Sequence, residues 1–174
     1  MKKLLIAAFL AEWLMASLPV PKYFSADFTQ VVQNKDTKKQ LYYSGRLFMK
    51  MPDEAKWDYF IPLKKSICLT EHKAWVIEPE LEQATLFRLN QSIPLLQILK
   101  SARKVGPDTY KAEYDGIDYA LKVDKDKRIS SVSYLDEMGN RVTLRFQNIE
   151  TKPFDSSKLE CLIPDGFDII DGRY

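Results

Sequence analysis

Histidine and cysteine are scarce in this sequence, and their scarcity excludes several classes of enzyme. His72 is the only histidine among 174 residues, and Cys68 and Cys161 are the only cysteines. Common zinc sites and Ser-His or Cys-His centres need such side chains in clusters, and no nucleophile elbow, phosphate loop or His-Glu-x-x-His motif occurs. We therefore expect no catalytic residue, no metal site and no cofactor. Because acidic residues are plentiful, a pair of carboxylates acting as acid and base is the alternative that stays open.

The sequence also lacks an excess of either charge. Its 26 Lys and Arg residues oppose 24 Asp and Glu residues, which leaves a net charge of +2, and the two signs are interspersed. This balance indicates neither a nucleic-acid partner nor binding to an anionic membrane surface. The length and the 45% hydrophobic content predict a single domain with one core.

Long apolar runs are absent as well. The longest, residues 4–11, has eight residues, too few to span a bilayer. Because it follows the basic start Met1-Lys2-Lys3, it predicts an export signal over residues 1–16, cleaved after Ala16, with one mature domain over residues 17–174. The alternative is an apolar first helix that is retained.

The two cysteines can be compared by strand parity. Cys68 alternates with Ser66 and Thr70, whereas Cys161 alternates with Leu159 and Ile163. If both segments are strands of one sheet, the two thiols point to opposite faces and cannot be bridged without distortion. We therefore expect two free thiols, while an even number of cysteines in an exported protein favours a disulfide.

The clearest pattern is a hairpin around residues 45–59. Leu47, Met49 and Met51 occupy alternate positions before a turn at Pro52, and apolar residues occupy alternate positions again after it. This is typical of two antiparallel strands with one buried face. The second apolar set is Trp57, Tyr59 and Ile61, and the opposite face carries Arg46, Lys50, Lys56 and Asp58. Such large side chains line either a filled core or a cavity for an apolar ligand.

Most other segments also show strand periodicity. Turns every eight to twelve residues predict an antiparallel sheet, arranged as a sandwich or a barrel. The expected strands lie near residues 24–32, 67–69, 74–77, 83–89, 110–114, 117–123, 142–146 and 159–163. The only helix that we expect covers residues 92–104, with Ser92 as its cap and Lys100, Arg103 and Lys104 in its last turn.

Several of these segments together resemble the LolA family of periplasmic lipoprotein carriers. The resemblance rests on residues 24–30 (FSADFTQ), Ser44-Gly45 followed by Pro52 and Trp57-Asp58-Tyr59, Trp75 followed by Pro79 and residues 82–85 (EQAT), and Phe154-Asp155 followed by Pro164-Asp165-Gly166. These features occur in the order and with the spacing of the family, from residue 24 to residue 171. None of them is decisive alone.

The resemblance implies a mainly β fold, in which a strongly curved antiparallel sheet forms an incomplete barrel with a helical lid over an apolar cavity. It implies a monomer in the periplasm that takes lipoproteins by their acyl chains from an inner-membrane ABC exporter and passes them to an outer-membrane acceptor. The expected cavity wall is Leu47, Met49, Met51, Trp57, Tyr59, Ile67, Leu69, Trp75 and Ile77. The expected lid residues are Ile93, Leu95, Leu96, Ile98 and Leu99.

The sequence departs from the family pattern at three places. Family members have an arginine before the hairpin proline, where it latches the lid, and Met51 stands there in this chain. The Asp-Gly turn before Trp75 is replaced by Thr70-Glu71-His72, and the N-terminal helix of the family is missing if cleavage follows Ala16. The resemblance leaves two other functions open, namely a carrier of free lipid or glycolipid and a protein-binding scaffold with a filled core.

Overall fold

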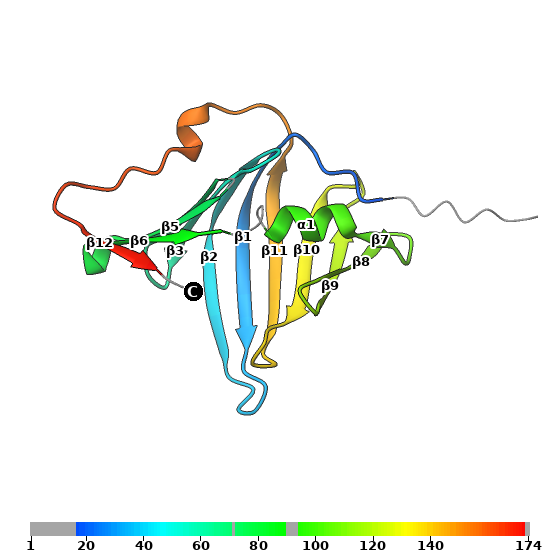
Figure 1. The fold of residues 1–174 in the computed structure, drawn as a ribbon. Helices are drawn as coiled ribbons and strands as arrows, with labels where there is room; N and C mark the ends of the chain where they lie inside the picture. Colours follow the sequence, from blue (N-terminus) through cyan, green and yellow to red (C-terminus); the bar gives the residue numbers. More distant parts are fainter. Residues whose placement is uncertain (1–16, 71, 90–93, 173–174) are drawn as a thin grey trace, which may run out of the picture.

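One strongly curved sheet makes up most of the fold (Figure 1). The computed structural model describes residues 17–70, 72–89 and 94–172. Twelve strands form the sheet in the order β12-β6-β5-β4-β3-β2-β1-β11-β10-β9-β8-β7. The strands are β1 (Tyr23–Gln33), β2 (Gln40–Lys50), β3 (Glu54–Ile61), β4 (Lys65–Thr70), β5 (Lys73–Glu78), β6 (Gln83–Arg88), β7 (Arg103–Lys104), β8 (Thr109–Tyr114), β9 (Ile117–Val123), β10 (Ile129–Leu135), β11 (Arg141–Glu150) and β12 (Asp168–Gly172).

The sheet is antiparallel except at one edge, where β12 pairs parallel with β6. It curls around the α-helix α1 (Pro94–Ser101), which lies across its concave side (Figure 1). Two short 3₁₀ helices, η1 (Pro79–Leu81) and η2 (Ser156–Leu159), complete the described elements. The expected mainly β fold, an open curved sheet with a helix over it, is confirmed. No helix in the described ranges is long and apolar enough to cross a bilayer.

The hairpin expected from residues 45–59 is present as β2 and β3. Leu47 pairs with Trp57 and Met49 with Ala55, so these side chains share the concave face. Gly45 is required beside them, because a Cβ there would overlap the Asp58 carbonyl oxygen and lie 2.8 Å from the Phe28 ring. The absence of a side chain at Gly45 therefore lets the Phe28 ring approach the β2 backbone closely.

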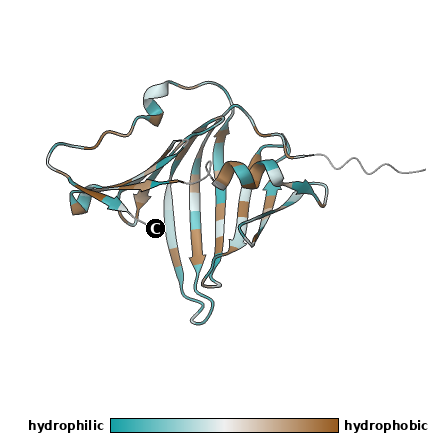
Figure 2. Ribbon diagram, viewed as in Figure 1, coloured by the Kyte–Doolittle hydropathy of each residue, from teal (hydrophilic) through white to brown (hydrophobic). Residues whose placement is uncertain are grey.

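Alternation of apolar and polar residues along β1, β2 and β11 gives the sheet two different faces (Figure 2). The concave face carries the large core cluster, which includes the fully buried Phe28, Leu47, Met49 and Leu121. Strand β10 belongs to this face through Val132 and Tyr134, although the sequence analysis did not predict it. Its polar residues Ser130, Ser131 and Ser133 interrupt the alternation of apolar and polar residues by which a strand is recognised.

The helix is shorter than expected. It ends at Ser101, and Arg103 and Lys104 form strand β7 against β8 instead of a last helical turn. Ser92 and Ile93 lie outside the described residues. The chain before β1 is tied to this region, since Ser17 bridges to Arg103 and Leu18 is buried in the core. The expected signal segment, residues 1–16, also lies outside the described residues.

A long segment after β11 crosses the convex face. Residues 151–167 run from the end of β11 to the β6 edge (Figure 1), and η2 contacts β2 and β3 on the way. The expected strand over residues 159–163 is wrong, because this segment is irregular and the last strand is β12.

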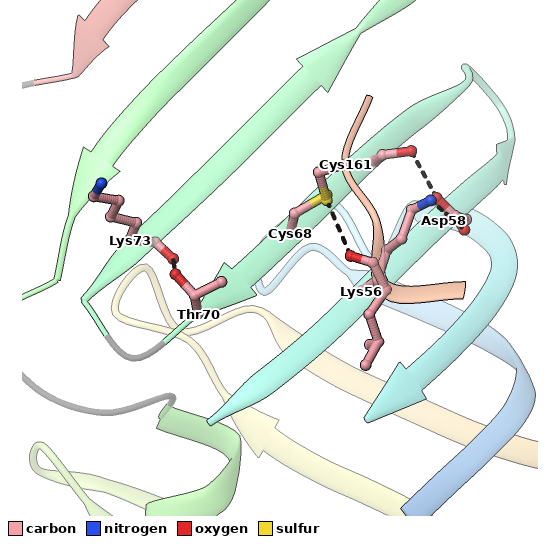
Figure 3. Close-up of a disulfide and its surroundings, with 8 residues drawn as sticks. Lys56, Asp58, Cys68, Thr70, Lys73 and Cys161 are labelled. Atoms are coloured by element: carbon pink, nitrogen blue, oxygen red, sulfur yellow. Dashed lines mark hydrogen bonds and ion pairs between the residues drawn. A yellow bond between two sulfur atoms is a disulfide. The ribbon is translucent and has the colours of Figure 1, made fainter. Parts of the chain in front are cut away.

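The expectation of two free thiols is wrong for the same reason. Cys68 and Cys161 form a disulfide with a Cα–Cα distance of 6.3 Å (Figure 3). The parity argument required Cys161 to lie in the sheet, whereas it lies on the segment that passes over the convex face. There it meets Cys68, Ile77 and Ala84, which form a second, smaller core cluster.

We predict that breaking the disulfide destabilises the fold without changing its architecture. It links residues 93 positions apart, and closing so long a loop in the unfolded chain contributes on the order of 4 kcal/mol. The variant Cys68→Ser with Cys161→Ser should therefore show a lower free energy of unfolding in urea. Reduced wild type is the matched control, and equal stability of all three proteins would contradict the prediction.

Candidate functional site

The candidate site is the space between α1 and the concave face of the sheet. Leu96, Ile98 and Leu99 of the helix are at most 5% exposed, and Ala102 behind them is fully buried. They join the same core cluster as Leu47 and Met49 of β2. The helix therefore covers the sheet with its apolar side, and the exposed Lys100 lies on the other side.

A small apolar cavity separates the helix from the sheet. It measures about 10 Å³, and its wall contains no polar side chain. The lining residues are Phe24, Leu47, Met49, Leu95, Leu99, Ile129, Val132 and Phe146. A volume of this size holds at most about one water molecule. The space between α1 and the sheet is therefore nearly filled, and it has no room for an acyl chain in this conformation.

The concave face continues beyond the helix onto β3 and β4. Trp57, Tyr59 and Leu69 are half-buried there and pack against the core cluster. Ile67 is also half-buried and pairs with Trp57, which puts it on the same face. This part of the face is more accessible than the part under α1.

An aromatic row joins these two parts of the concave face. Phe28 makes edge contacts with Trp57 and Tyr59 at centroid distances of 5.1 and 5.0 Å, and Tyr59 makes another with Tyr43 at 6.2 Å. The Tyr59 hydroxyl donates a hydrogen bond to Gln30 Oε1 at 3.2 Å. Burial raises the pKa of Tyr59 to about 12 and also raises that of Tyr134. Both hydroxyls are therefore neutral at physiological pH, which keeps this surface free of their charge.

Two of the expected cavity residues lie on the other face. Trp75 pairs with Cys68, and Ile77 pairs with Ser66, so both side chains point to the convex side and pack in the disulfide cluster. The cavity wall expected from the family resemblance had included both. The register of β4 and β5 puts Ala74 and Val76 there instead.

The structure also adds residues that sequence reasoning missed. Phe24, Ile129, Val132 and Phe146 line the cavity from β1, β10 and β11. Alternation alone could have suggested Phe24 and Phe146, but only the pairing of β1 with β11 brings them together, with their rings 5.6 Å apart. Met51 packs half-buried against the core cluster, and its backbone N–H donates to the Lys22 carbonyl at 2.8 Å.

The convex face carries a different kind of cavity. It measures about 570 Å³ and lies beneath residues 151–167, with Arg46, Lys56, Asp58 and Lys158 among its lining residues. Lys56 pairs with Asp58 at 3.7 Å, and Ser66 donates to the same carboxylate at 2.6 Å. Phe48, Phe60 and Phe154 also line this cavity, but its charged side chains of both signs make it less suited to an apolar ligand than the concave face. No group of three or more metal-ligating side chains occurs in the described part of the chain.

Comparison with known proteins gives one matching family model. It is described as "Outer membrane lipoprotein carrier protein LolA" and matches residues 21–105. The matched region includes β1 to β6, α1 and β7, and therefore both the hairpin and the helix of the candidate site.

Curated relatives match over a longer range. A protein of Helicobacter hepaticus is 36% identical over 147 residues, which cover 84% of this chain and 82% of the relative. A protein of Campylobacter jejuni is 34% identical over 148 residues, which cover 84% and 85%. Both are named outer-membrane lipoprotein carrier protein.

A solved structure is similar in fold. The crystal structure of an uncharacterized conserved protein from Thermus thermophilus matches with a TM-score of 0.57 at 13% identity, covering 88% of this chain and 92% of that protein. At this identity the likeness shows the fold alone.

We predict that Tyr59 makes the stability of the protein fall at high pH. Its pKa is raised to about 12 in the folded state, whereas an unfolded tyrosine ionises near 10. Between these values only the unfolded state loses the proton, so the free energy of unfolding decreases as the pH rises. Urea unfolding at increasing pH should show a shallower decline for Tyr59→Phe, and an unchanged decline would contradict the assignment.

Proposed function

The chain belongs to the LolA family of outer-membrane lipoprotein carrier proteins, and from this premise we propose that it carries lipoproteins by enclosing their acyl chains between α1 and the concave face of the sheet. The observation that carries the proposal is the small cavity under α1, whose eight lining side chains are all apolar. An acyl chain needs no more than such a surface, because each buried CH₂ contributes about 0.8 kcal/mol.

The helix suits the part of a movable lid. It has eight residues, and helices this short are not stable in water without packing. Its position therefore depends on the apolar contacts of Leu96, Ile98 and Leu99. An acyl chain that occupies the cavity replaces these contacts with its own, so the lid can be displaced at a modest net cost and close again after release.

The half-buried residues of β3 and β4 extend the proposed binding surface. Trp57, Tyr59, Ile67 and Leu69 would contact the parts of the acyl chains that α1 does not cover. Trp75 and Ile77 are left out of this wall because they face the disulfide.

The remaining parts of the proposal concern location and partners. We infer that residues 1–16 direct export to the periplasm, where an oxidising environment suits the Cys68–Cys161 disulfide. A monomer would then receive lipoproteins from an inner-membrane ABC exporter and deliver them to the outer membrane. Energy is supplied at the exporter. Release from the carrier needs no further energy, because the cargo moves to a partner that binds it more tightly.

Native mass spectrometry of the protein purified from the periplasm tests this function. Bound triacylated lipoprotein is the expected result. Extractable free lipid or glycolipid in its place would support the alternative carrier, and protein that is always empty would overturn both.

We predict that a charge under the lid weakens cargo binding. Leu99→Glu places a carboxylate where the side chain is 1% exposed, which costs several kcal/mol unless α1 lifts away. Binding of an apolar fluorescent probe should fall at least tenfold. Lys100→Glu, on the exposed side of the same helix, is the control.

If Leu99→Glu does not fold, Leu95→Glu makes the same test, because Leu95 lines the cavity but is only half-buried. Folded variants that still carry lipoprotein would show that α1 is not the lid.

We predict that Met51→Arg tightens closure of the lid. Met51 occupies the position at which the family resemblance implies a latching arginine, and it packs against the cluster that contains Leu96 and Leu99. A guanidinium there adds hydrogen-bond donors where Met51 supplies apolar contact alone. Stopped-flow uptake of an apolar probe should be slower in Met51→Arg than in wild type or Met51→Leu. Identical rates would exclude this position as a latch.

A further inference from the structure

Large apolar side chains are exposed together at one end of the sheet. At this end β1 and β2 run beyond β3, and their hairpin projects from the rest of the sheet (Figure 1). Five side chains, which we call the end patch, are between 56% and 61% exposed. They are Leu41 and Tyr42 of β2, Phe60 and Ile61 of β3, and Leu63 in the loop that follows.

The register brings these residues next to one another. Ile61 pairs with Ser44, so Tyr42, two residues before Ser44 in β2, is its diagonal neighbour at about 7 Å. Residues 40–43 of β2 pair with β1 only, and the chain leaves β3 beside them. Because Leu41 and Tyr42 are consecutive in β2, their side chains point to opposite faces of the sheet. The end patch therefore wraps around this end of the sheet, and it is built from two segments about twenty positions apart.

Lysines surround the end patch. Residues 34–42 and 60–65 contain five lysines and one acidic residue, Asp36. The lysines are Lys35, Lys38, Lys39, Lys64 and Lys65, and none of them forms a salt bridge within the described residues. The adjacent β10–β11 turn contributes Asp136 and Glu137, and also Met138, which is 70% exposed. Positive charge is in excess, five against three, around an apolar centre.

We propose that this end of the sheet docks on the surface of an anionic lipid bilayer. Apolar and aromatic side chains enter the boundary between headgroups and acyl chains, while lysine stems extend so that their ammonium groups reach lipid phosphates. A projecting hairpin with more than half of each apolar side chain exposed fits a deformable surface. A binding site for a protein partner typically has a well-packed pocket that an anchoring side chain fills, and the end patch is a projecting surface instead.

The position of the end patch suggests what membrane docking would do for the protein. This part of the inference rests on the proposed carrier function. The aromatic row Tyr43, Tyr59, Phe28 and Trp57 leads from this end of the sheet into the concave face, with successive ring centroids 5.0 to 6.2 Å apart. A bilayer held at the end patch therefore meets the accessible side of the cavity. Acyl chains can pass along this row without crossing bulk water.

Vesicle co-sedimentation of the oxidised, cargo-free protein tests docking. We expect binding to phosphatidylglycerol-containing vesicles that weakens with salt, and little binding to phosphatidylcholine vesicles. Leu63→Gln should weaken binding about tenfold, whereas Leu162→Gln, at a more exposed leucine on the convex segment, should not. Lys39→Gln and Lys64→Gln should each weaken it about fivefold, and Lys125→Gln, an exposed lysine elsewhere, is the control.

The result separates docking from carrying. The proposal would be overturned if the wild type does not bind these vesicles. It would also be overturned if the control variants Leu162→Gln and Lys125→Gln lose as much binding as the end-patch variants. Transfer of cargo that needs a protein acceptor and no lipid contact would overturn it as well. Lipoprotein bound in the periplasm with no vesicle binding leaves the carrier function intact. Vesicle binding by a protein that never carries lipoprotein refutes the carrier function instead.

Discussion

The concave face of the sheet is apolar from β2 through β10, and one helix of eight residues covers it in the described chain. Among the described residues no second sheet packs on this face, so the burial of Leu47, Met49 and Leu121 depends on the contact with α1. The contact is close, since the space left is about 10 Å³. A short helix held by apolar contact alone is both the closure of the core and, in the proposed function, the part that moves.

The contacts on the convex face do not involve α1. The disulfide between Cys68 and Cys161 fastens residues 151–167 across β3 and β4, and β12 then pairs with the edge strand β6. On this face Lys56, Asp58 and Ser66 interact with one another. The two faces therefore differ in kind, since covalent and polar contacts join the elements on the convex face, whereas the concave face is held by apolar contacts.

Sequence reasoning succeeded where structure depends on neighbours along the chain. The alternation of Leu47, Met49, Trp57 and Tyr59 predicted both the hairpin and its apolar face, because strand side chains point to opposite sides in turn. It failed for Trp75 and Ile77, because apolar residues on both sides of β5 make the two faces look alike. The pairing of Trp75 with Cys68 decides the matter, and periodicity within β5 does not reveal this pairing.

The amino-acid sequence by itself determined the fold class, the family and the apolar character of the hairpin and the helix. Only the tertiary structure decided the disulfide, the cavity wall and the end patch. The net charge of only +2 did not indicate binding to a membrane surface. Folding nevertheless places lysines from residues 35–39 and 64–65 around exposed apolar side chains. The physical reason is that such clusters arise from strand register and crossing segments, which join residues far apart in the chain, whereas composition and periodicity describe only what lies close together along it.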